Sequence, residues 1–440
     1  MTPVPFREAL AFWLKLGFIS FGGPAGQIAI MHQELVERRR WISERRFLHA
    51  LNFCMLLPGP EATQLATYIG WLMHRTWGGI VAGGLFVLPS VFILIALSYL
   101  YMAFGDVTLV AGLLYGVKPA VVAIVLAAAW RIGSRALRHP VLWAISLAAF
   151  AAIYLLHVPF PAIVLAAAAL GALGARLVPS AFASSAAHGG TANGYGPALI
   201  DDATPPPAHA RYSAGRLAAY VAAGLGLWLA ALLALAIAFG RDGTLIHMGL
   251  FFTKAALLTF GGAYAVLPYV YQAAVEHFHW LSAPQMIDGL ALGETTPGPL
   301  IMVVAFVGFV GGWSRALFGP EHLFLAGAAA AVVATFFTFL PSFLFILIGG
   351  PLVEATHGDL KFTAPLTGIT AAVVGVIVSL ALFFAQHVFW PKGLSSAVDW
   401  LSLAATAIAL VALVRSKIGL IPLVGVMAAA GAALRLAGLA

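Results

Sequence analysis

The sequence predicts an all-α membrane protein that crosses the bilayer many times and consists of two homologous halves. Of its 440 residues, 62% are hydrophobic and only 9% are charged, whereas a soluble domain usually carries about 25% charged residues. Apolar runs of roughly 20 residues, the length that crosses a bilayer as a helix, recur along the chain. These runs are continuous rather than alternating, which favours helices over a transmembrane β-barrel.

The apolar runs divide the chain into two parts of similar length. The expected domains are an N-terminal repeat at 1–178, a linker at 179–212, a connecting transmembrane helix at 213–240 and a C-terminal repeat at 245–440. The linker is rich in Ser, Ala, Gly and Pro, which indicates a flexible segment outside the membrane, with His188 and His209 solvated. Thirteen apolar segments are expected, at 8–31, 47–73, 77–104, 107–131, 140–157, 159–178, 213–239, 245–272, 284–313, 321–349, 361–387, 398–414 and 418–438.

Composition and motifs exclude several function classes. The formal net charge of +7 fits the cytoplasmic excess of Lys and Arg that orients membrane proteins better than nucleic-acid binding. The single cysteine, Cys54, excludes an intramolecular disulfide and a cysteine metal cluster. The sequence has no nucleotide-binding loop, zinc-protease or serine-hydrolase motif, so we expect no catalytic residue, metal or cofactor. The N-terminus lacks a signal-peptide pattern, and the expected location is the bacterial inner membrane.

The two halves are duplicates of one another. Residues 12–60 align without a gap with residues 251–299, and fourteen of these 49 positions are identical. Shared hydrophobicity does not explain identities that include a Lys, a Trp and a Pro-Gly-Pro. Farther along, residues 88–90 match residues 340–342, and both are Leu-Pro-Ser.

The distribution of basic residues predicts that the halves have inverted topology. The loop at 32–46 carries five arginines, whereas its counterpart at 271–285 carries no Lys or Arg. Cytoplasmic loops are rich in Lys and Arg, so the two loops are expected on opposite sides of the membrane. If the Phe-Gly-Gly and Pro-Gly-Pro segments enter and leave on the same side, sixteen of the 23 basic residues become cytoplasmic and four lie outside. This arrangement places the N-terminus in the cytoplasm and the C-terminus outside.

Four breaks in the apolar segments mark the expected substrate site. Backbone groups inside a bilayer must be satisfied, so a break survives only where it is buried in protein or lines a cavity. A half-helix that starts after a break offers free N–H groups and a positive dipole, which suit an anion. Gly and Pro can also simply kink or pack membrane helices, but two kinds of break repeated in register favour a site. The residues assigned to it are Gly22, Gly23, Pro24, Pro58, Gly59, Pro60, Gly261, Gly262, Pro297, Gly298 and Pro299.

Two lysines lie at equivalent positions, six residues before each Phe-Gly-Gly. Lys15 and Lys254 are within apolar segments, where a charge is costly and is a candidate for function. They are therefore assigned to an anionic substrate, and the alternative is that each extends to the membrane interface. Lys118 has Thr370 as its counterpart and is expected to extend to the interface.

Carboxylates and uncharged polar residues flank the same breaks. Glu61 and Glu294 are candidates for carrying a coupling proton, or they could simply pair with Lys15 and Lys254. The uncharged residues assigned to the substrate are suited to hydrogen bonding with an oxyanion, although such side chains also satisfy helix backbone groups. They are Gln27, Thr63, Gln64, Thr295 and Thr296.

The ordered set of motifs resembles the chromate ion transporter family over nearly the whole chain. The matching pieces are FGGP at 21–24, ELVERRRWIS at 34–43, LLPGPEATQLATYIG at 56–70, LPS at 88–90, FGG at 260–262 and TPGP at 296–299. The resemblance implies a long-chain member with two homologous domains that exports chromate, with sulfate as a dianion of similar shape. Many members carry a His shortly after each Phe-Gly-Gly. This chain instead has Ala25-Gly26-Gln27 and Ala263-Tyr264 there, which bears on the oxyanion it prefers.

Three functions are therefore compared. The first is a secondary transporter that exports chromate, and sulfate with it, by alternating access. The second is an uptake transporter for sulfate or another oxyanion. The third is a membrane-embedded chromate reductase, which the lone Cys54 and the lack of a redox-cofactor motif disfavour. The expected partners are a chromate- or sulfate-like dianion and the lipid bilayer, with a homodimer as one assembly left open.

Overall fold

The computed structural model describes residues 4–21, 23–182, 195–202, 204–205, 207–355, 363–415 and 418–439. Within these residues the chain is helical, and its one β-type contact is an isolated parallel bridge between Ile42 and Ile200. Six helical stretches are long and apolar enough to cross a membrane: 61–104, 108–136, 160–177, 214–239, 320–351 and 364–389. The protein is an all-α multi-pass membrane protein, as the composition predicts.

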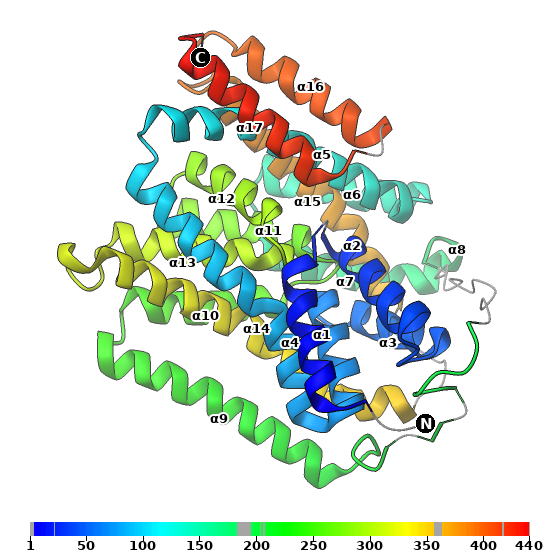
Figure 1. Ribbon diagram of the computed structural model, residues 1–440. Helices are drawn as coiled ribbons and strands as arrows, with labels where there is room; N and C mark the ends of the chain where they lie inside the picture. The colour runs from blue at the N-terminus through cyan, green and yellow to red at the C-terminus, as the bar shows by residue number, and fades with distance from the viewer. Residues whose placement is uncertain are drawn as a thin grey trace.

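Among the described residues, seven main helices form the first half and eight form the second, with one further helix between the halves (Figure 1). The first half contains α1 (Phe6–Ile19), α2 (Gly23–His32), α3 (Glu44–Leu56), α4 (Glu61–Phe104), α5 (Thr108–Ala136), α6 (Pro140–Tyr154) and α7 (Phe160–Leu177), followed by the single turn α8 (Pro179–Phe182). The connecting helix is α9 (Ala214–Phe239). The second half contains α10 (Thr244–Leu257), α11 (Ala263–Tyr271), α12 (Ala283–Thr295), α13 (Val303–Ser314), α14 (Leu323–Ala355), α15 (Thr363–Phe389), α16 (Trp400–Arg415) and α17 (Leu420–Leu436).

Local details repeat between the halves at the shift read from the sequence. A π-helical turn follows α2 at Gln33–Arg38 and follows α11 at Gln272–His277. The next helix then begins after a capping serine in both halves: Ser43 accepts from the backbone N–H of Arg46, and Ser282 accepts from that of Gln285. Ser and a hydroxyl-to-backbone bond are typical of a helix start. The duplication therefore extends to helix bounds and caps.

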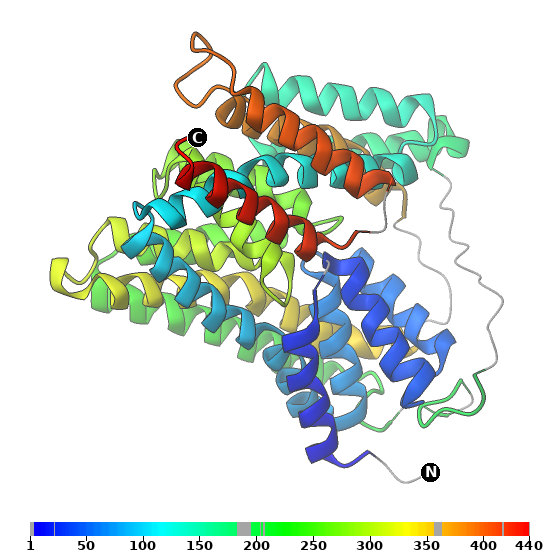
Figure 2. The same cartoon turned by 45° about the horizontal axis from the view of Figure 1, so that its top comes forward.

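The helices that flank the breaks are short. Helix α1 has 14 residues and α2 has 10, so α1 is about 21 Å long and neither helix alone crosses a bilayer core of about 30 Å. Figures 1 and 2 show α1 rising to the break and α2 turning back from it. Helices α10 and α11 are the equivalent short pair, with 14 and 9 residues.

Helix α4 is a hairpin of two arms. Its backbone leaves helical geometry at His74 and Arg75, where Arg75 has a φ of 57°. The arms, residues 61–73 and 76–104, then pack closely, because a Cβ added to Gly70 would lie 2.4 Å from the carbonyl oxygen of Gly78. Helices α13 and α14 form the corresponding pair in the second half, where Gly308 meets the backbone of Ala330. Small residues allow this close approach of helices in a membrane.

The halves exchange their last two helices. Helices α16 and α17 pack on α5, and α6 and α7 pack on α15. Glycines form both contacts: a Cβ on Gly431 would lie 2.4 Å from the Cα of Gly116, and a Cβ on Gly368 would lie 3.0 Å from the Cα of Gly171. Figure 1 shows α16 and α17 beside α5 at the top of the molecule. Helices α5 and α15, the central helices of the two halves, are therefore each packed by helices of the other half.

Helix α9 lies at the margin of the bundle (Figure 1). It contacts α14 and α10, and Gly224 is the buried residue among its 26. A helix that is apolar all round and exposed in the protein faces lipid. The connecting transmembrane helix expected at 213–240 falls on α9, and its place as a separate connecting segment stays a prediction.

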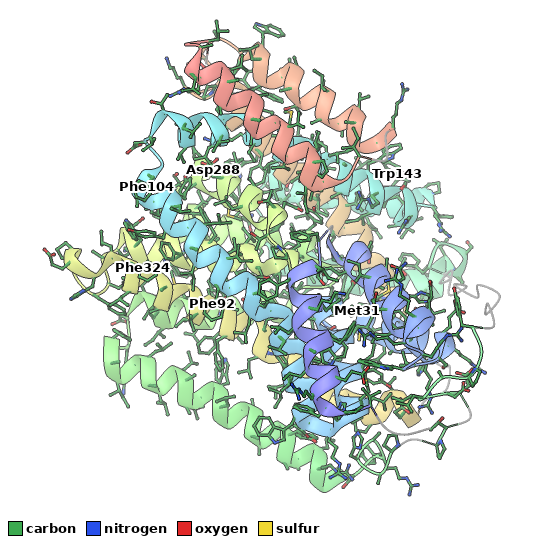
Figure 3. The ribbon with its side chains drawn as sticks, in the orientation of Figure 1. Met31, Phe92, Phe104, Trp143, Asp288 and Phe324 are labelled. Atoms are coloured by element: carbon green, nitrogen blue, oxygen red, sulfur yellow. The ribbon has the colours of Figure 1, made fainter. Side chains whose placement is uncertain are left out.

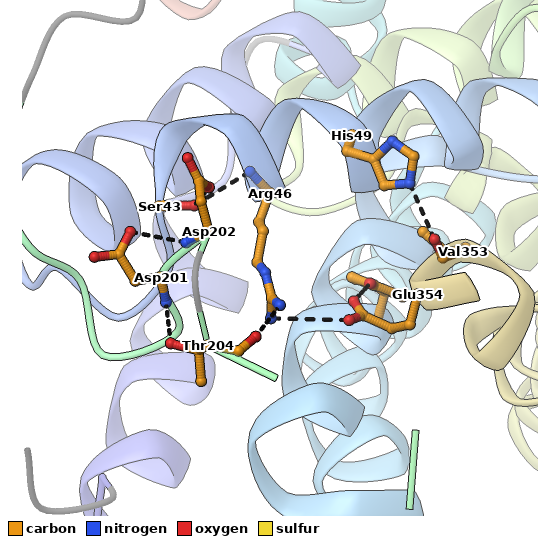
Figure 4. A network of polar contacts seen from close by, with 9 residues as sticks. Ser43, Arg46, His49, Asp201, Asp202, Thr204, Val353 and Glu354 are labelled. Atoms are coloured by element: carbon orange, nitrogen blue, oxygen red, sulfur yellow. Dashed lines mark hydrogen bonds and ion pairs between the residues drawn. The ribbon is translucent and has the colours of Figure 1, made fainter. Parts of the chain in front are cut away.

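The linker differs from the free segment that its composition predicts. Leu199 and Ile200 donate backbone hydrogen bonds to the carbonyls of Arg40 and Trp41, at 2.8 and 3.1 Å. Figure 4 shows the adjoining contacts of the linker with α3, in which Asp202 accepts from Ser43 at 2.6 Å and the carbonyl of Thr204 accepts from Arg46. The described part of the linker is therefore docked on the Arg-rich loop.

The prediction that His209 is solvated is wrong. The ring is half-buried and its Nε2 lies 2.9 Å from the carbonyl oxygen of Trp71. Burial disfavours the charged form and lowers the pKa of His209 below its usual value. His188, the second linker histidine, lies outside the described residues.

Gly431→Ala tests the exchanged packing. The added methyl would press on the Gly116 backbone, which cannot move aside, so we expect a loss of about 1–3 kcal/mol of stability and a lower thermal midpoint in detergent. Gly425→Ala on the same helix is the matched control, since a Cβ there meets no atom within 4 Å. Equal midpoints for the two variants would contradict the packing.

Candidate functional site

The breaks of one half are closed by those of the other. The backbone N–H of Gly59 donates to the carbonyl of Thr259 at 2.7 Å, and the N–H of Gly298 donates to the carbonyl of Ser20 at 2.7 Å. Gly59 and Gly298 are equivalent positions, as are Ser20 and Thr259. Each Pro-Gly-Pro therefore forms a hydrogen bond with the residue directly before the Phe-Gly-Gly of the other half. We call these two contacts the break crossings.

Glycine is required at both crossings. Gly59 has a φ of 125° and Gly298 a φ of 105°, which L-residues with a side chain rarely adopt. Space is also lacking, because a Cβ on Gly59 would lie 2.3 Å from the Ser342 hydroxyl oxygen. A Cβ on Gly298 would collide with the hydroxyl of Ser90 in the same way. The repeated glycines thus serve the crossings and not only helix packing.

Polar side chains from both halves surround the crossings. At one crossing, Gln27 donates to the carbonyl of Gly298 at 2.5 Å, and Ser90 donates to the carbonyl of Pro297. At the other, Gln64 donates to the carbonyl of Pro58 at 2.8 Å. These bonds satisfy carbonyls that the breaks release from helices, as a buried backbone requires.

Four polar side-chain atoms at the breaks are buried and have no hydrogen-bond partner among the described residues. They are Ser20 Oγ, Thr63 Oγ1, Gln64 Oε1 and Ser342 Oγ. A buried polar group without a partner costs about 1–3 kcal/mol. Three of the four are hydroxyls that can donate, so they can bind the oxygens of an oxyanion.

Helix starts point at the same region. Helix α4 begins at Glu61 directly after Pro60, α11 begins at Ala263 directly after Gly262, and the 3-10 turn before α13 begins at Leu300 directly after Pro299. No side chain caps any of these three starts. Uncapped N-termini present free N–H groups and a partial positive charge.

The remaining break residues lie at or beside the starts of α2 and α11. Gly23, Gly261 and Gly262 have positive φ values of 71°, 78° and 94°, and Pro24 lies in the first turn of α2. Gly22 lies outside the described residues. Thr295 and Thr296 donate to carbonyls of their own helix, at Ala291 or Leu292, which is the purely structural alternative for such side chains.

The two predicted carboxylates differ in their surroundings. Glu294 is buried and accepts a hydrogen bond of 2.5 Å from the hydroxyl of Tyr264. Glu61 is half-buried at the start of α4. No ion pair among the described residues joins either carboxylate to Lys15 or Lys254. Tyr264, which departs from the family pattern, is thus a direct partner of Glu294.

The structure does not bring the two repeated lysines to the crossings. Lys15 and Lys254 are exposed on α1 and α10. Lys254 lines a cavity of about 430 Å³ together with His157, His247 and Glu276. Their assignment to the substrate stays a prediction.

The expectation for Lys118 is wrong. Its Nζ lies 3.5 Å from Asp288 Oδ2, so it forms an ion pair with the other half instead of extending to the interface alone. Thr370 at the equivalent position donates to the carbonyl of Leu366 in its own helix.

Sequence reasoning missed four residues at the crossings: Ser20, Thr259, Ser90 and Ser342. The signals were present. A small hydroxyl residue precedes each Phe-Gly-Gly, and Leu-Pro-Ser recurs in both halves. The repeated serine indicates the duplication, but its contact with the break depends on tertiary packing.

Comparison with known proteins decides the family. The family model described as chromate transporter matches residues 7–172 and 246–434. The chain belongs to the chromate transporter family. The two matched regions contain the two sets of breaks and leave out the linker and the whole of the connecting helix α9. No solved structure matches this chain.

Two curated chromate transport proteins resemble the chain along most of its length, and a shorter relative resembles part of it. A chromate transport protein of Pseudomonas aeruginosa is 34% identical over 389 residues, covering 87% of this chain and 82% of that protein. A chromate transport protein of Cupriavidus metallidurans is 30% identical over 388 residues, with coverages of 87% and 83%. An uncharacterised transporter of Bacillus subtilis, YwrB, matches over 134 residues, which are 30% of this chain and 68% of that protein, at 30% identity.

Ser342→Ala and Ser90→Ala separate binding from folding. Ser342 Oγ has no hydrogen-bond partner in the part of the chain that the structure describes, so its loss should leave the thermal midpoint unchanged and raise the transport KM for chromate. Ser90 satisfies the carbonyl of Pro297, so its loss should cost about 1–3 kcal/mol of stability. Thermal melting and vesicle uptake measure the two effects. A normal KM in Ser342→Ala would remove this hydroxyl from the site.

Proposed function

We propose that this protein is a secondary transporter that moves chromate, and sulfate with it, out of the cytoplasm across the bacterial inner membrane. The observation that carries the proposal is the pair of break crossings. Buried hydroxyls without a partner among the described residues and uncapped helix starts both lie at these breaks, in a chain of the chromate transporter family. Buried donors and helix N-termini are the usual means of binding a dehydrated oxyanion.

The substrate would be held by groups that carry no full charge. The donors are the hydroxyls of Ser20, Thr63 and Ser342 and the N–H groups that begin α4 and α11. The break glycines and prolines and the amides of Gln27 and Gln64 would fix these donors in position. Lys15 and Lys254 would supply positive potential where the dianion approaches, since both are exposed on helices that lead to the breaks.

Alternating access would follow from the duplication. The reciprocal hydrogen bonds join equivalent break segments of the two halves. They support a mechanism in which these segments change partners around one central region. We propose that the halves have inverted topology, with the Arg-rich loop at 32–46 in the cytoplasm and the loop at 271–285 outside. Movement of one half against the other would then expose the crossings to one side at a time.

A second function, uptake of sulfate or another oxyanion, has one specific observation in its favour. The residues that replace the family's histidines contact the site: Gln27 bonds to Gly298, and Tyr264 bonds to Glu294. Selectivity among tetrahedral dianions depends on such contacts. Growth of a chromate-exposed host discriminates the two functions, because an exporter protects the cells and an importer sensitises them.

The direct test is chromate uptake into everted membrane vesicles. An exporter fills these vesicles, sulfate competes if it shares the site, and a pH gradient changes the rate if protons are coupled through Glu61 or Glu294. The product must still be Cr(VI), because Cr(III) inside the vesicles would indicate a reductase. Vesicles that take up no chromate would overturn the proposal.

Lys15→Ala and Lys254→Ala test the lysine contribution. Each change should raise the KM for chromate by roughly two- to tenfold, because one partly screened charge contributes about 1 kcal/mol to binding a dianion. Lys392→Ala, an exposed lysine in the loop before α16, is the control. Wild-type KM values in both variants would assign these lysines to the membrane interface.

A further inference from the structure

A buried ion pair links the halves at the far end of α4. Asp288 of α12 is 3% exposed, and its Oδ2 lies 3.5 Å from Lys118 Nζ of α5. The hydroxyl of Tyr101, near the end of α4, donates to the same oxygen at 3.0 Å. The second oxygen, Oδ1, is buried and has no hydrogen-bond partner among the described residues. Figure 3 labels Asp288 close to the end of α4.

A second group of the same kind lies at the hairpin end of α4. Glu354 of α14 is 8% exposed, and its Oε2 lies 3.8 Å from Arg46 Nη1 of α3. Tyr68, in the first arm of α4, donates to the other carboxylate oxygen. Figure 4 shows the contact of Arg46 with Glu354 and the neighbouring His49, whose ring lies 3.1 Å from the carbonyl of Val353.

The two groups have the same composition, and we call each a triad of a carboxylate, a tyrosine and a cation. In each, the carboxylate comes from the second half, and the tyrosine and the cation come from the first. The two tyrosines lie at different levels along the second arm of α4, residues 76–104. Tyr68 follows Thr67, which packs against Gly79 and Gly83 near the start of that arm. Tyr101 is close to the end of the arm. About twenty residues of helix separate these levels, or roughly 30 Å, the thickness of a bilayer core.

Separating the halves at either end breaks an ion pair in a poorly solvated place. Removing one partner of a buried pair leaves an uncompensated charge and is strongly destabilising. A proton on the carboxylate removes the negative charge. The cation that is left keeps other contacts, because the Lys118 side chain is 30% exposed to water and Arg46 also donates to the carbonyl of Thr204. Each triad therefore opens more easily with a proton bound.

We propose that Asp288 and Glu354 are proton-binding sites, one at each end of the protein, and that their protonation releases the contact between the halves at that end. The inference rests on the proposed function and adds its coupling ion. The groups that face Asp288 are Lys118 and Tyr101, and Asp106, past the end of α4, acts on Tyr101. Those that face Glu354 are Arg46 and Tyr68, with His49 and Cys54 beside them.

Asp288→Asn and Glu354→Gln test the proposal in proteoliposomes. An uncharged amide mimics the protonated carboxyl permanently. Exchange of labelled for unlabelled chromate across a membrane without a gradient should persist, whereas accumulation driven by a pH gradient should fall to the level without one. Asp242→Asn and Glu321→Gln, at exposed carboxylates, are the matched controls and should accumulate like wild type.

The outcomes distinguish this inference from the proposed function. If the wild type exchanges no chromate, the proposed function fails. If the wild type exchanges chromate and both amide variants still accumulate it with the gradient, the proton-binding role fails.

Tyr68→Phe and Tyr101→Phe decide the matter if the amide variants do not fold. Each removes one hydrogen bond to the charged carboxylate and changes no charge, so the pH profile of driven transport should move to higher pH. Tyr99→Phe on the same arm, where the ring is 36% exposed, is the control. Profiles that coincide with wild type in both variants would overturn the proposal.

Discussion

Two backbone hydrogen bonds, from Gly59 to Thr259 and from Gly298 to Ser20, are the constraint on which the rest of the structure depends. A broken helix in a bilayer frees N–H and C=O groups that lipid cannot satisfy. Here the groups freed in one half are satisfied by the equivalent break of the other. The short helices around the breaks, the positive φ values of the glycines and the positions of Ser90 and Ser342 all follow from holding the two crossings together.

A site without buried cations also suits a carrier that must return empty. A lysine fixed beside the crossings would be an unpaired charge in a medium of low dielectric whenever the substrate had left. Hydroxyls and helix N-termini would bind a dianion with partial charges only, so these donors leave no unpaired cation behind when the substrate departs. The exposed positions of Lys15 and Lys254 are consistent with this, because charge at the approach attracts the anion and costs little when the site is empty.

The fold class, the duplication and the positions of the breaks could be predicted because local sequence features determine them. These features are the lengths of the apolar runs, the positions of Gly and Pro, and the identities at a constant shift. The pairing between the breaks could not, because it depends on which face each helix presents to the other half. Lys118 shows the difference. Its sequence neighbours are apolar and indicate an isolated charge, but the fold brings Asp288 to it from 170 residues away. The docked part of the linker was missed for the same reason, since its contacts are backbone bonds to residues 40–43.

The exchange of terminal helices has a consequence for biosynthesis. Helix α5 is complete early in translation, but the glycine face at Gly116 is covered by α17, which the ribosome makes much later. Until then this face must be shielded by lipid or by the insertion machinery. The packing of the first half is therefore completed only after α17 has been made, and a chain that stops short of α17 leaves the first half unfinished.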